Sequence, residues 1–221
     1  MKAVLFDFNG TLYNDTDFHR RAWRNYIKKR FGVDVSDEVL DRDFIGPGNE
    51  TILKTFFNGN ITAEEIEKYS LEKEGEYRSV CRSDPKNLQL IEGAYELFDL
   101  LRAKGIPFAV ATSSGVNNVN FYLNDLGLGK WLTIDDIVYE DGRFEGKPAP
   151  DFYLEAARRV GADIADCIVC EDSRTGLKSA INAGAGRIIA MDRSLPIEEL
   201  KSMPEVFAVI HDYYNFEQYL Q

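Results

Sequence analysis

One stretch decides the fold of this chain: Ala3-Val4-Leu5-Phe6-Asp7-Phe8-Asn9-Gly10-Thr11-Leu12. Its first four residues form an apolar run without a charge, which predicts a buried strand of a parallel sheet. A carboxylate that follows such a strand lies at the carboxyl edge of the sheet, where open α/β folds bind their ligands. Gly10 lets the chain leave the strand in a conformation that other residues resist. We therefore expect Asp7 at the mouth of a crevice, as a nucleophile or a metal ligand.

Composition and charge narrow the class of protein. Of the 221 residues, 44% are hydrophobic and 29% are charged, which is typical of a soluble globular protein. No apolar run approaches the roughly 18 residues that span a membrane, and strand sequence at the N-terminus leaves no room for a signal peptide. The net charge of -11 disfavours nucleic-acid binding. It still allows a phosphate ligand, because lysines and backbone N–H groups can bind phosphate locally.

The cysteines predict a reducing compartment. The chain has only three cysteines, a low and odd number that does not indicate a disulfide framework. We therefore expect a cytoplasmic protein without a membrane partner. Cys167 and Cys170 are spaced like a redox or metal pair, but residues three apart in a strand point to opposite faces. We therefore interpret this pair as structural. Protein partners and oligomeric state are left open.

A helical block interrupts the sheet-like sequence after the first strand. Its turn signal, Gly46-Pro47-Gly48-Asn49, lies between helix candidates. Thr62 and Glu65 have the spacing of a capping box at the start of a long helix that extends to about Val80. The predicted helices are His19–Phe31, one that follows Ser36, Glu50–Phe57 and the one that Thr62 opens. We expect residues 15–86 to form a separate helical domain, inserted into a core domain made of residues 1–14 and 87–221.

From Glu92 onward, helices and strands alternate, which predicts βαβ units and a parallel sheet. The predicted strands are Ile106–Ala111, Ile137–Tyr139 with a short return at Arg143-Phe144, Cys167–Cys170, Arg187–Met191 and Val206–Ile210. The predicted helices are Ala94–Lys104, Val116–Leu126, Asp151–Val160 and Thr175–Asn182. The expected fold class is therefore α/β, with a Rossmann-like parallel sheet and an all-helical insert.

Polar segments follow the strands at the places where a ligand would bind. After Asp7 come three further segments: Thr112-Ser113-Ser114-Gly115, Gly146-Lys147-Pro148-Ala149-Pro150-Asp151 and Glu171-Asp172-Ser173. They supply hydroxyls, a cation in a turn stiffened by proline, and a pair of acids. One strand-end acid alone would be an ordinary surface residue. Together, these groups make a coherent site for phosphoryl transfer.

These four segments resemble, in order, the four motifs of the haloacid dehalogenase-like (HAD) hydrolase superfamily. The resemblance spans nearly the whole chain, and the helical block falls where this superfamily carries its helical cap. The Gly-Lys-Pro-x-Pro-Asp and Glu-Asp-Ser-x-x-Gly motifs are typical of the subfamily of β-phosphoglucomutase and small sugar-phosphate or phosphoglycolate phosphatases. The motifs are specific for the fold and indicate phosphoryl chemistry, but they say little about the substrate.

The resemblance implies a nucleophile and a metal site. Asp7 would attack phosphorus and form an aspartyl-phosphate. Mg²⁺ would be bound by Asp7, by the backbone carbonyl of Asn9 and by Asp172, with Glu171 acting directly or through water. The ion would screen the charge on both the nucleophile and the phosphate.

The same resemblance implies a site for the phosphoryl oxygens. Thr112, Ser113 and Lys147 would hold these oxygens, and Ser114 belongs to the same binding segment. The hinges of the helical domain would lie near residues 13–15 and 86–92. That domain would close over the site and exclude water.

Asn9 departs from the motif, which has a second Asp at this position. In the family, that acid protonates the leaving alkoxide and later deprotonates the attacking water; a carboxamide can do neither. Its backbone carbonyl can still bind a metal, so binding should survive better than turnover. Three explanations stay open: a natural variant in which His19 or a water chain replaces the acid, an engineered Asp→Asn change, or a protein that binds phosphate esters without cleaving them.

Three residues of the helical block are candidates for contact with the substrate. His19 has the spacing from the nucleophile that a His has in mutase relatives, and Lys73 matches a substrate-contacting Lys on a cap helix. Asn49 stands near the place where mutase relatives carry an Arg for a second phosphate, so its lack of charge argues against a bisphosphate substrate. The alternative for His19 and Lys73 is an ordinary helix residue without contact to substrate.

The sequence therefore predicts a Mg²⁺-dependent phosphohydrolase of a small phosphorylated metabolite, acting through an aspartyl-phosphate on Asp7. Asn9 would attenuate this activity. The alternatives are a phosphotransferase like β-phosphoglucomutase and a catalytically silent phosphate-ester-binding protein.

Overall fold

The computed structural model describes residues 1–221. The chain divides into two compact units. The core unit consists of Met1–Asn14 and Gln89–Gln221, and the helical unit consists of Asp15–Leu88. The function of the helical unit as a cap stays a prediction.

The core unit is built on a parallel sheet of six strands in the order β3-β2-β1-β4-β5-β6. This confirms the expected Rossmann-like α/β fold. Every neighbouring pair of strands is parallel, so all carboxyl ends meet at one edge of the sheet. The strands are β1 Ala3–Phe6, β2 Phe108–Gly115, β3 Ile137–Glu140, β4 Cys167–Glu171, β5 Arg187–Met191 and β6 Val206–Ile210.

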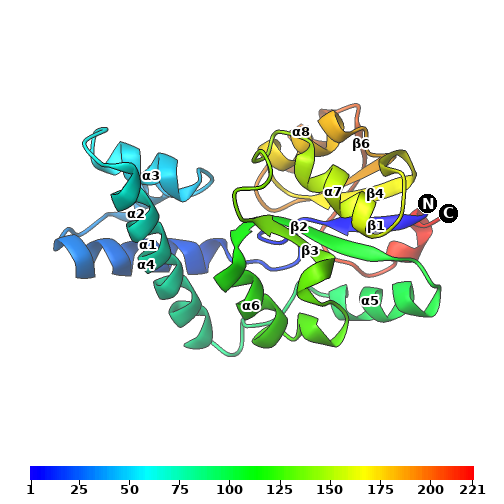
Figure 1. Ribbon diagram of the computed structural model, residues 1–221, viewed down its shortest axis with the longest axis horizontal. Helices are drawn as coiled ribbons and strands as arrows, with labels where there is room; N and C mark the ends of the chain where they lie inside the picture. The colour runs from blue at the N-terminus through cyan, green and yellow to red at the C-terminus, as the bar shows by residue number, and fades with distance from the viewer. The chain divides into compact units, whose positions relative to one another are not determined.

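Helices of the core unit cover both faces of this sheet. In Figure 1, α7 and α8 lie over one face, and α5 and α6 lie over the other. The helices of this unit are α5 Ala94–Ala103, α6 Val116–Asn124, α7 Asp151–Arg159, α8 Arg174–Ala183 and α9 Ile197–Ser202. This double covering explains why β1 reads as a continuous apolar run: all four of its residues are buried.

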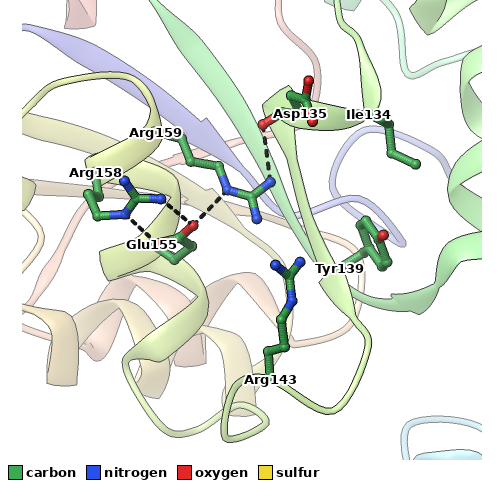
Figure 2. A pocket seen from close by; sticks show the side chains of 7 residues that line it. All are labelled: Ile134, Asp135, Tyr139, Arg143, Glu155, Arg158 and Arg159. Atoms are coloured by element: carbon green, nitrogen blue, oxygen red, sulfur yellow. Dashed lines mark hydrogen bonds and ion pairs between the residues drawn. The ribbon is translucent and has the colours of Figure 1, made fainter.

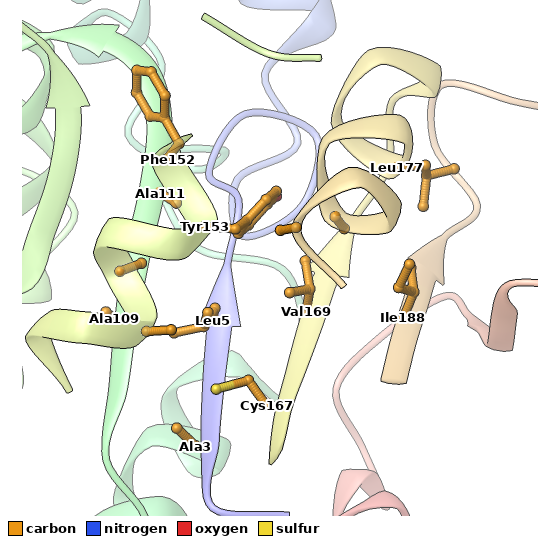
Figure 3. Close-up of a cluster of buried hydrophobic side chains, with 14 of the residues drawn as sticks. Ala3, Leu5, Ala109, Ala111, Phe152, Tyr153, Cys167, Val169, Leu177 and Ile188 are labelled. Atoms are coloured by element: carbon orange, nitrogen blue, oxygen red, sulfur yellow. The ribbon is translucent and has the colours of Figure 1, made fainter. Parts of the chain in front are cut away.

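The side chains of successive β1 residues point to opposite faces of the sheet. Ala3 and Leu5 belong to the hydrophobic cluster formed with α7 and α8, which Figure 3 shows. The ring of Phe6 contacts Phe98 of α5, with centroids 5.6 Å apart, and Phe108 at 6.4 Å, both edge to face. Packing on both faces fixes the register of β1, because a slip by one residue would exchange the two sets of side chains.

This register brings the polar strand ends to the same level. Phe6 is paired with Cys170 of β4 and with Val110 of β2. The next residues along the chain, Asp7 and Glu171, therefore leave the sheet side by side. The Asp7 backbone N–H still donates to the Cys170 carbonyl, at 3.0 Å.

The strand β3 forms one edge of the sheet, and an arginine covers part of it. Arg159 donates through Nη1 to the carbonyl of Ile137, at 3.0 Å, and to that of Asp135, at 3.1 Å (Figure 2). Glu155 accepts from Arg159 Nε at 2.8 Å. Covering edge carbonyls in this way disfavours pairing with another strand.

Some local predictions differ from the structure. The short return strand expected at Arg143-Phe144 does not form; this segment is a bend, and the Arg143 side chain pairs with Asp141 instead. The strand expected to end at Ala111 runs on to Gly115, although its pairing with β3 is irregular after Ala111. The helix α9 was not predicted.

The helical unit contains α1 Thr16–Phe31, α2 Asp37–Asp43, α3 Asn49–Phe56 and α4 Ala63–Arg82. The predicted capping box is confirmed: Thr62 accepts from the Glu65 backbone N–H at 3.2 Å, and Glu65 accepts from the Thr62 backbone N–H at 2.9 Å. Buried apolar residues from α1, α2 and α3 form its core, with Trp23, Ile27, Leu40 and Leu53 among them. No helix in the chain has the length and apolar character needed to cross a membrane.

Two glycines, one in a helix of each unit, allow a test of how closely Glu171 packs against α8. A Cβ at Gly176 of α8 would overlap the Glu171 carboxylate, whereas a Cβ at Gly75 of α4 would come no closer than 3.8 Å to Arg78. We expect Gly176→Ala to lower the free energy of unfolding by about 2 kcal/mol. Gly75→Ala should raise it by roughly 1 kcal/mol, because alanine favours the helix. Urea unfolding followed by circular dichroism measures both, and equal stability of the two variants would contradict the placement of Glu171.

Candidate active site

A buried lysine links two of the predicted acids. Lys147 Nζ lies 2.7 Å from Asp7 Oδ1 and 2.7 Å from Glu171 Oε1. The Lys147 side chain is 6% exposed and that of Glu171 is 1% exposed. The turn of the third motif thus places its cation between the carboxylate that follows β1 and the carboxylate of the last residue of β4.

Tyr153 of α7, which was not among the predicted site residues, also contacts both Lys147 and Glu171. Its hydroxyl accepts from Lys147 Nζ at 3.1 Å and donates to Glu171 Oε1 at 3.1 Å. The Lys147 ammonium also lies 4.7 Å from the centre of the Tyr153 ring. Tyr153 follows Asp151 by two residues at the start of a helix, so its nearness to the lysine motif was a usable signal.

The backbone that follows β4 holds Glu171. Its Oε2 accepts from the Asp172 N–H at 2.8 Å, from the Ser173 N–H at 2.9 Å and from the Ser173 hydroxyl at 3.1 Å. Ser173 is also the N-cap of α8, since its side chain accepts from the Gly176 N–H at 3.0 Å. With Lys147 on Oε1, both oxygens of Glu171 are fixed in place.

Asp172 is oriented by two hydroxyls. Thr11 donates to its Oδ1 at 3.2 Å, and Ser194, in the segment after β5, donates to its Oδ2. Gly10 makes this approach possible: its φ is +79°, and a Cβ there would overlap the Asp172 carboxylate. Thr11 belongs to the first motif, whereas no sequence signal pointed to Ser194.

Burial and mutual repulsion alter the acidity of the site. Burial raises the pKa of Asp7 to about 7, and Glu171 adds to the rise, while Lys147 and the Phe8 N–H oppose it. Burial raises the pKa of Asp172 well above its usual range, with Glu171 and Asp7 as further causes. Burial alone would lower the pKa of Lys147, but the carboxylates of Asp7 and Glu171 raise it above its usual value. The site therefore favours a charged lysine and resists an excess of negative charge.

The acids suit a hard divalent cation. One oxygen each from Asp7, Glu171 and Asp172 lies within 4.8 Å of the others, and all three residues are buried. When all three are ionised, Lys147 balances only one of their charges. Carboxylate oxygens are the ligands that Mg²⁺ and Ca²⁺ prefer. The donor set and its uncompensated charge thus fit a bound metal ion.

The predicted phosphate-binding segment lies at the end of β2. Thr112 is fully buried, and its hydroxyl accepts from the Ser114 N–H at 3.2 Å. Ser113 is exposed, and Ser114 is half-buried. The Ser114 hydroxyl donates to Asn9 Oδ1 at 3.0 Å, which joins this segment to the one that carries Asp7.

The remaining predicted residues lie in the helical unit, where Lys73 and Asn49 contact Glu74 and His19 contacts Lys73. Lys73 Nζ lies 2.8 Å from Glu74 Oε1 and 2.8 Å from His19 Nδ1, and Asn49 Nδ2 donates to Glu74 Oε1 at 2.8 Å. Lys73 is 1% exposed. Burial would raise the pKa of Glu74, but Lys73 and His19 lower it to about 2. His19, Asn49 and Lys73 thus form one cluster, in which Glu74 neutralises the lysine.

A second acid, Asp15, contacts His19 and Tyr77 beside this cluster. Asp15 accepts from the Tyr77 hydroxyl at 2.6 Å, and its Oδ2 lies 3.3 Å from His19 Nε2. The rings of His19 and Tyr77 are stacked, with centroids 4.1 Å apart. His19 is therefore held by its neighbours on both ring nitrogens. Neither Asp15 nor Glu74 was predicted, although Glu74 adjoins Lys73 in the sequence.

The pocket drawn in Figure 2 lies apart from these residues. It is lined by Ile134, Asp135, Tyr139, Arg143, Glu155, Arg158 and Arg159, and none of the predicted site residues is among them. Glu155 pairs with both Arg158 and Arg159. Arg143 pairs with Asp141, so each of the three lining arginines has an acidic partner.

The family model of haloacid dehalogenase-like hydrolases matches residues 1–184 of the chain. The chain belongs to this family. This match confirms the prediction of a HAD-like hydrolase. It also confirms the broader prediction that the chain is an enzyme of the phosphatase type.

Known proteins are similar over most of the chain. Hexitol phosphatase A of Escherichia coli is 29% identical, over 95% of this chain and 90% of that protein. The Arabidopsis thaliana protein SUPPRESSOR OF QUENCHING 1 is 32% identical over 91% of this chain, which spans only 19% of that protein's length.

Solved structures agree with this assignment. A HAD hydrolase of family IA, variant 3, from Entamoeba histolytica is 37% identical, with a TM-score of 0.91, over 100% of this chain and 98% of that one. A putative β-phosphoglucomutase from Thermotoga maritima is 25% identical, with a TM-score of 0.73, over 95% of this chain and 94% of that one. The likeness to the β-phosphoglucomutase subfamily is thus confirmed.

The repulsion among Asp7, Glu171 and Asp172 allows the metal site to be tested through protein stability. We expect Mg²⁺ to raise the melting temperature by on the order of 5 °C, because it binds the folded state and relieves repulsion among the acids. Asp172→Asn should remove most of this rise and stabilise the metal-free protein. Scanning calorimetry with and without Mg²⁺ measures both effects. Asp166→Asn, at an exposed position paired with Lys2, is the control and should keep the full response.

The glutamate of the helical unit gives a test with a defined pH dependence. Because the folded-state pKa of Glu74 lies near 2 and the usual value is 4.5, its charge stabilises the fold above about pH 4.5. That contribution is lost as the pH falls toward 2. Glu74→Gln should therefore lower the free energy of unfolding at pH 7 by about 2 kcal/mol, and the difference should shrink between pH 4.5 and 2.

Denaturant unfolding at several pH values measures this difference. Glu67→Gln, at an exposed position of the same helix, is the matched control and should change little. A difference for Glu74→Gln that stays constant down to pH 2 would contradict the ion pair.

Proposed function

We propose that the chain is a Mg²⁺-dependent phosphohydrolase that cleaves a small phosphorylated metabolite through an aspartyl-phosphate on Asp7. The observation that carries this proposal is the buried contact of Asp7 with Lys147, beside Glu171 and Asp172. A nucleophile, a fixed cation and a metal-binding group of acids stand together at the carboxyl edge of the sheet. Phosphoryl transfer depends chiefly on this kind of positioning and charge stabilisation.

In this proposal, Asp7 attacks phosphorus, the bond from phosphorus to the ester oxygen breaks, and the alkoxide leaves and takes its proton from water, since Asn9 has no acidic proton to give. Water then attacks the aspartyl-phosphate and releases inorganic phosphate, which restores the carboxylate. Lys147 and the hydroxyl of Thr112 hold the phosphoryl oxygens, with the N–H groups at Ser113 and Ser114 nearby. Asp7, Asp172 and the Asn9 carbonyl, with Glu171 directly or through water, would hold a Mg²⁺ ion, which when bound would neutralise charge on the nucleophile and the phosphate.

The substrate class follows from the relatives as part of the proposal. The name of hexitol phosphatase A refers to a phosphorylated sugar alcohol. Neutralisation of Lys73 by Glu74 supports a substrate with a single phosphate. A phosphorylated sugar or polyol, with an uncharged leaving group rich in hydroxyls, is therefore the class that we propose. The helical unit acts as its cap and supplies His19, Asn49 and Lys73.

Asn9 favours a second candidate function. A carboxamide cannot donate a proton to a leaving alkoxide or take one from water, so the chain would bind phosphate esters and turn them over slowly or not at all. A phosphate-ester-binding protein without turnover is the alternative that this residue supports.

The nucleophile is tested with a panel of sugar phosphates and p-nitrophenyl phosphate in the presence of Mg²⁺. Asp7→Asn keeps the size of the side chain and removes its nucleophilic carboxylate, so it should abolish turnover. Asp166→Asn is the control for the loss of one surface acid. Undiminished turnover by Asp7→Asn would refute the covalent mechanism.

The proton donor is tested in the same assay. Asn9→Asp should raise kcat for sugar phosphates at least tenfold, on the order of the lower end of general acid catalysis, with little change in KM. The gain should be small for p-nitrophenyl phosphate, whose leaving group departs without a proton. Failure of both the original chain and Asn9→Asp to cleave any ester would favour the binding protein.

A further inference from the structure

A closed ring of hydrogen bonds surrounds the side chain of Asn9. Its Nδ2 donates to the Tyr122 hydroxyl at 3.1 Å, and its Oδ1 accepts from the Ser114 hydroxyl at 3.0 Å. The two hydroxyls lie 2.8 Å apart. Each member of this ring can therefore donate one hydrogen bond to the next member and accept one from the previous member.

The ring joins three elements of the core unit. Asn9 follows β1, Ser114 lies at the end of β2, and Tyr122 lies on α6. Tyr122 is fully buried, and its ring stacks on Phe8 at 3.6 Å between centroids. Because Phe8 stands between Asp7 and Asn9, this stacking and the ring together fix the segment that carries the nucleophile to the segment that carries Thr112.

The pattern of donors suits a neutral side chain at position 9. A carboxylate has no hydrogen to give to Tyr122, so the phenol would donate its own hydrogen to residue 9, whose Oδ1 lies 3.4 Å from the Tyr122 hydroxyl. The bond from Tyr122 to Ser114 would then lose its hydrogen, and the ring would open. The presence of Tyr122 is thus matched to Asn9 rather than to an ionised Asp.

We propose that Tyr122 is a positioning residue for the reaction: its hydroxyl, together with that of Ser114, holds residue 9 beside the nucleophile. This inference rests on the proposed phosphohydrolase function. The phenol of Tyr122 acts through Asn9, whose backbone carbonyl is a metal ligand in the proposed function. Small displacements of residues that orient a reacting group reduce the rate more than they reduce substrate binding.

The test is a double-mutant cycle on the full chain, with Mg²⁺ and sugar phosphates. Tyr122→Phe removes only the hydroxyl and should lower kcat by roughly threefold to tenfold, with KM changed less than twofold. In an Asn9→Ala background, the same change should cost clearly less, because the hydrogen bond between Asn9 and Tyr122 is already absent and only the one between Tyr122 and Ser114 remains to be lost. Tyr95→Phe is the matched control: its hydroxyl donates to the Leu126 carbonyl elsewhere in the core unit, and kcat should be unchanged.

A second measurement does not depend on turnover. The side-chain amide signals of Asn9 in a ¹⁵N spectrum, identified by their loss in Asn9→Asp, should shift and exchange with solvent faster in Tyr122→Phe. Ser114→Thr retains a hydroxyl and should preserve these signals better than Ser114→Ala. Tyr95→Phe should leave the signals in place.

The outcomes separate the two proposals. Equal rate losses from Tyr122→Phe with and without Asn9 would show an effect on the fold alone and overturn the positioning role. Unchanged amide signals in Tyr122→Phe would overturn the ring itself. Failure of every variant, Asn9→Asp included, to cleave any ester would overturn the proposed function and with it the catalytic role of Tyr122, whatever the amide signals show.

Discussion

The site depends on the placement of one buried ammonium group. Burying a charge is costly unless it is paired, and a lone carboxylate in this place would be protonated instead. Lys147 stands between Asp7 and Glu171 and so allows two acids to lie close together at the end of the sheet. Asp172 adds a third acid without a lysine of its own, which leaves room for a metal cation in the charge balance.

The backbone of the sheet, rather than contacts between side chains, places these groups close together. Parallel register places Asp7 level with Glu171, and the apolar residues of β1 fix that register by packing on both faces. The backbone then makes space: Gly10 and Gly176 stand where a side chain would overlap Asp172 or Glu171. The hydrophobic core thus determines the geometry of a polar site that lies outside it.

The sequence predicted that Asp7, Thr112 and Glu171 would lie at one edge of the sheet, because each stands at or near the carboxyl end of a strand and these ends converge in a parallel sheet. It did not predict Tyr153, Ser194 or Tyr122. These residues come from helices or connecting segments, and their contacts with the site depend on how α6, α7 and the β5–α9 connection pack. The short return strand expected at Arg143-Phe144 does not form for a related reason: Asp141 binds the Arg143 side chain within the turn, a contact that the residue types alone did not indicate.

In the family motif, residue 9 can both bind a metal through its backbone carbonyl and transfer a proton through its side chain; in this chain, only the first is possible. Its backbone carbonyl can serve a metal whatever its side chain is, whereas proton transfer needs a carboxyl group. In this chain, the side chain lies in a ring that requires a donor at position 9, and Asn supplies that donor without adding a further negative charge two residues from Asp7. Under the proposed function, a neutral residue here would favour binding of an anionic ester over its rapid cleavage, because it adds no charge to a site in which three buried acids share a single lysine.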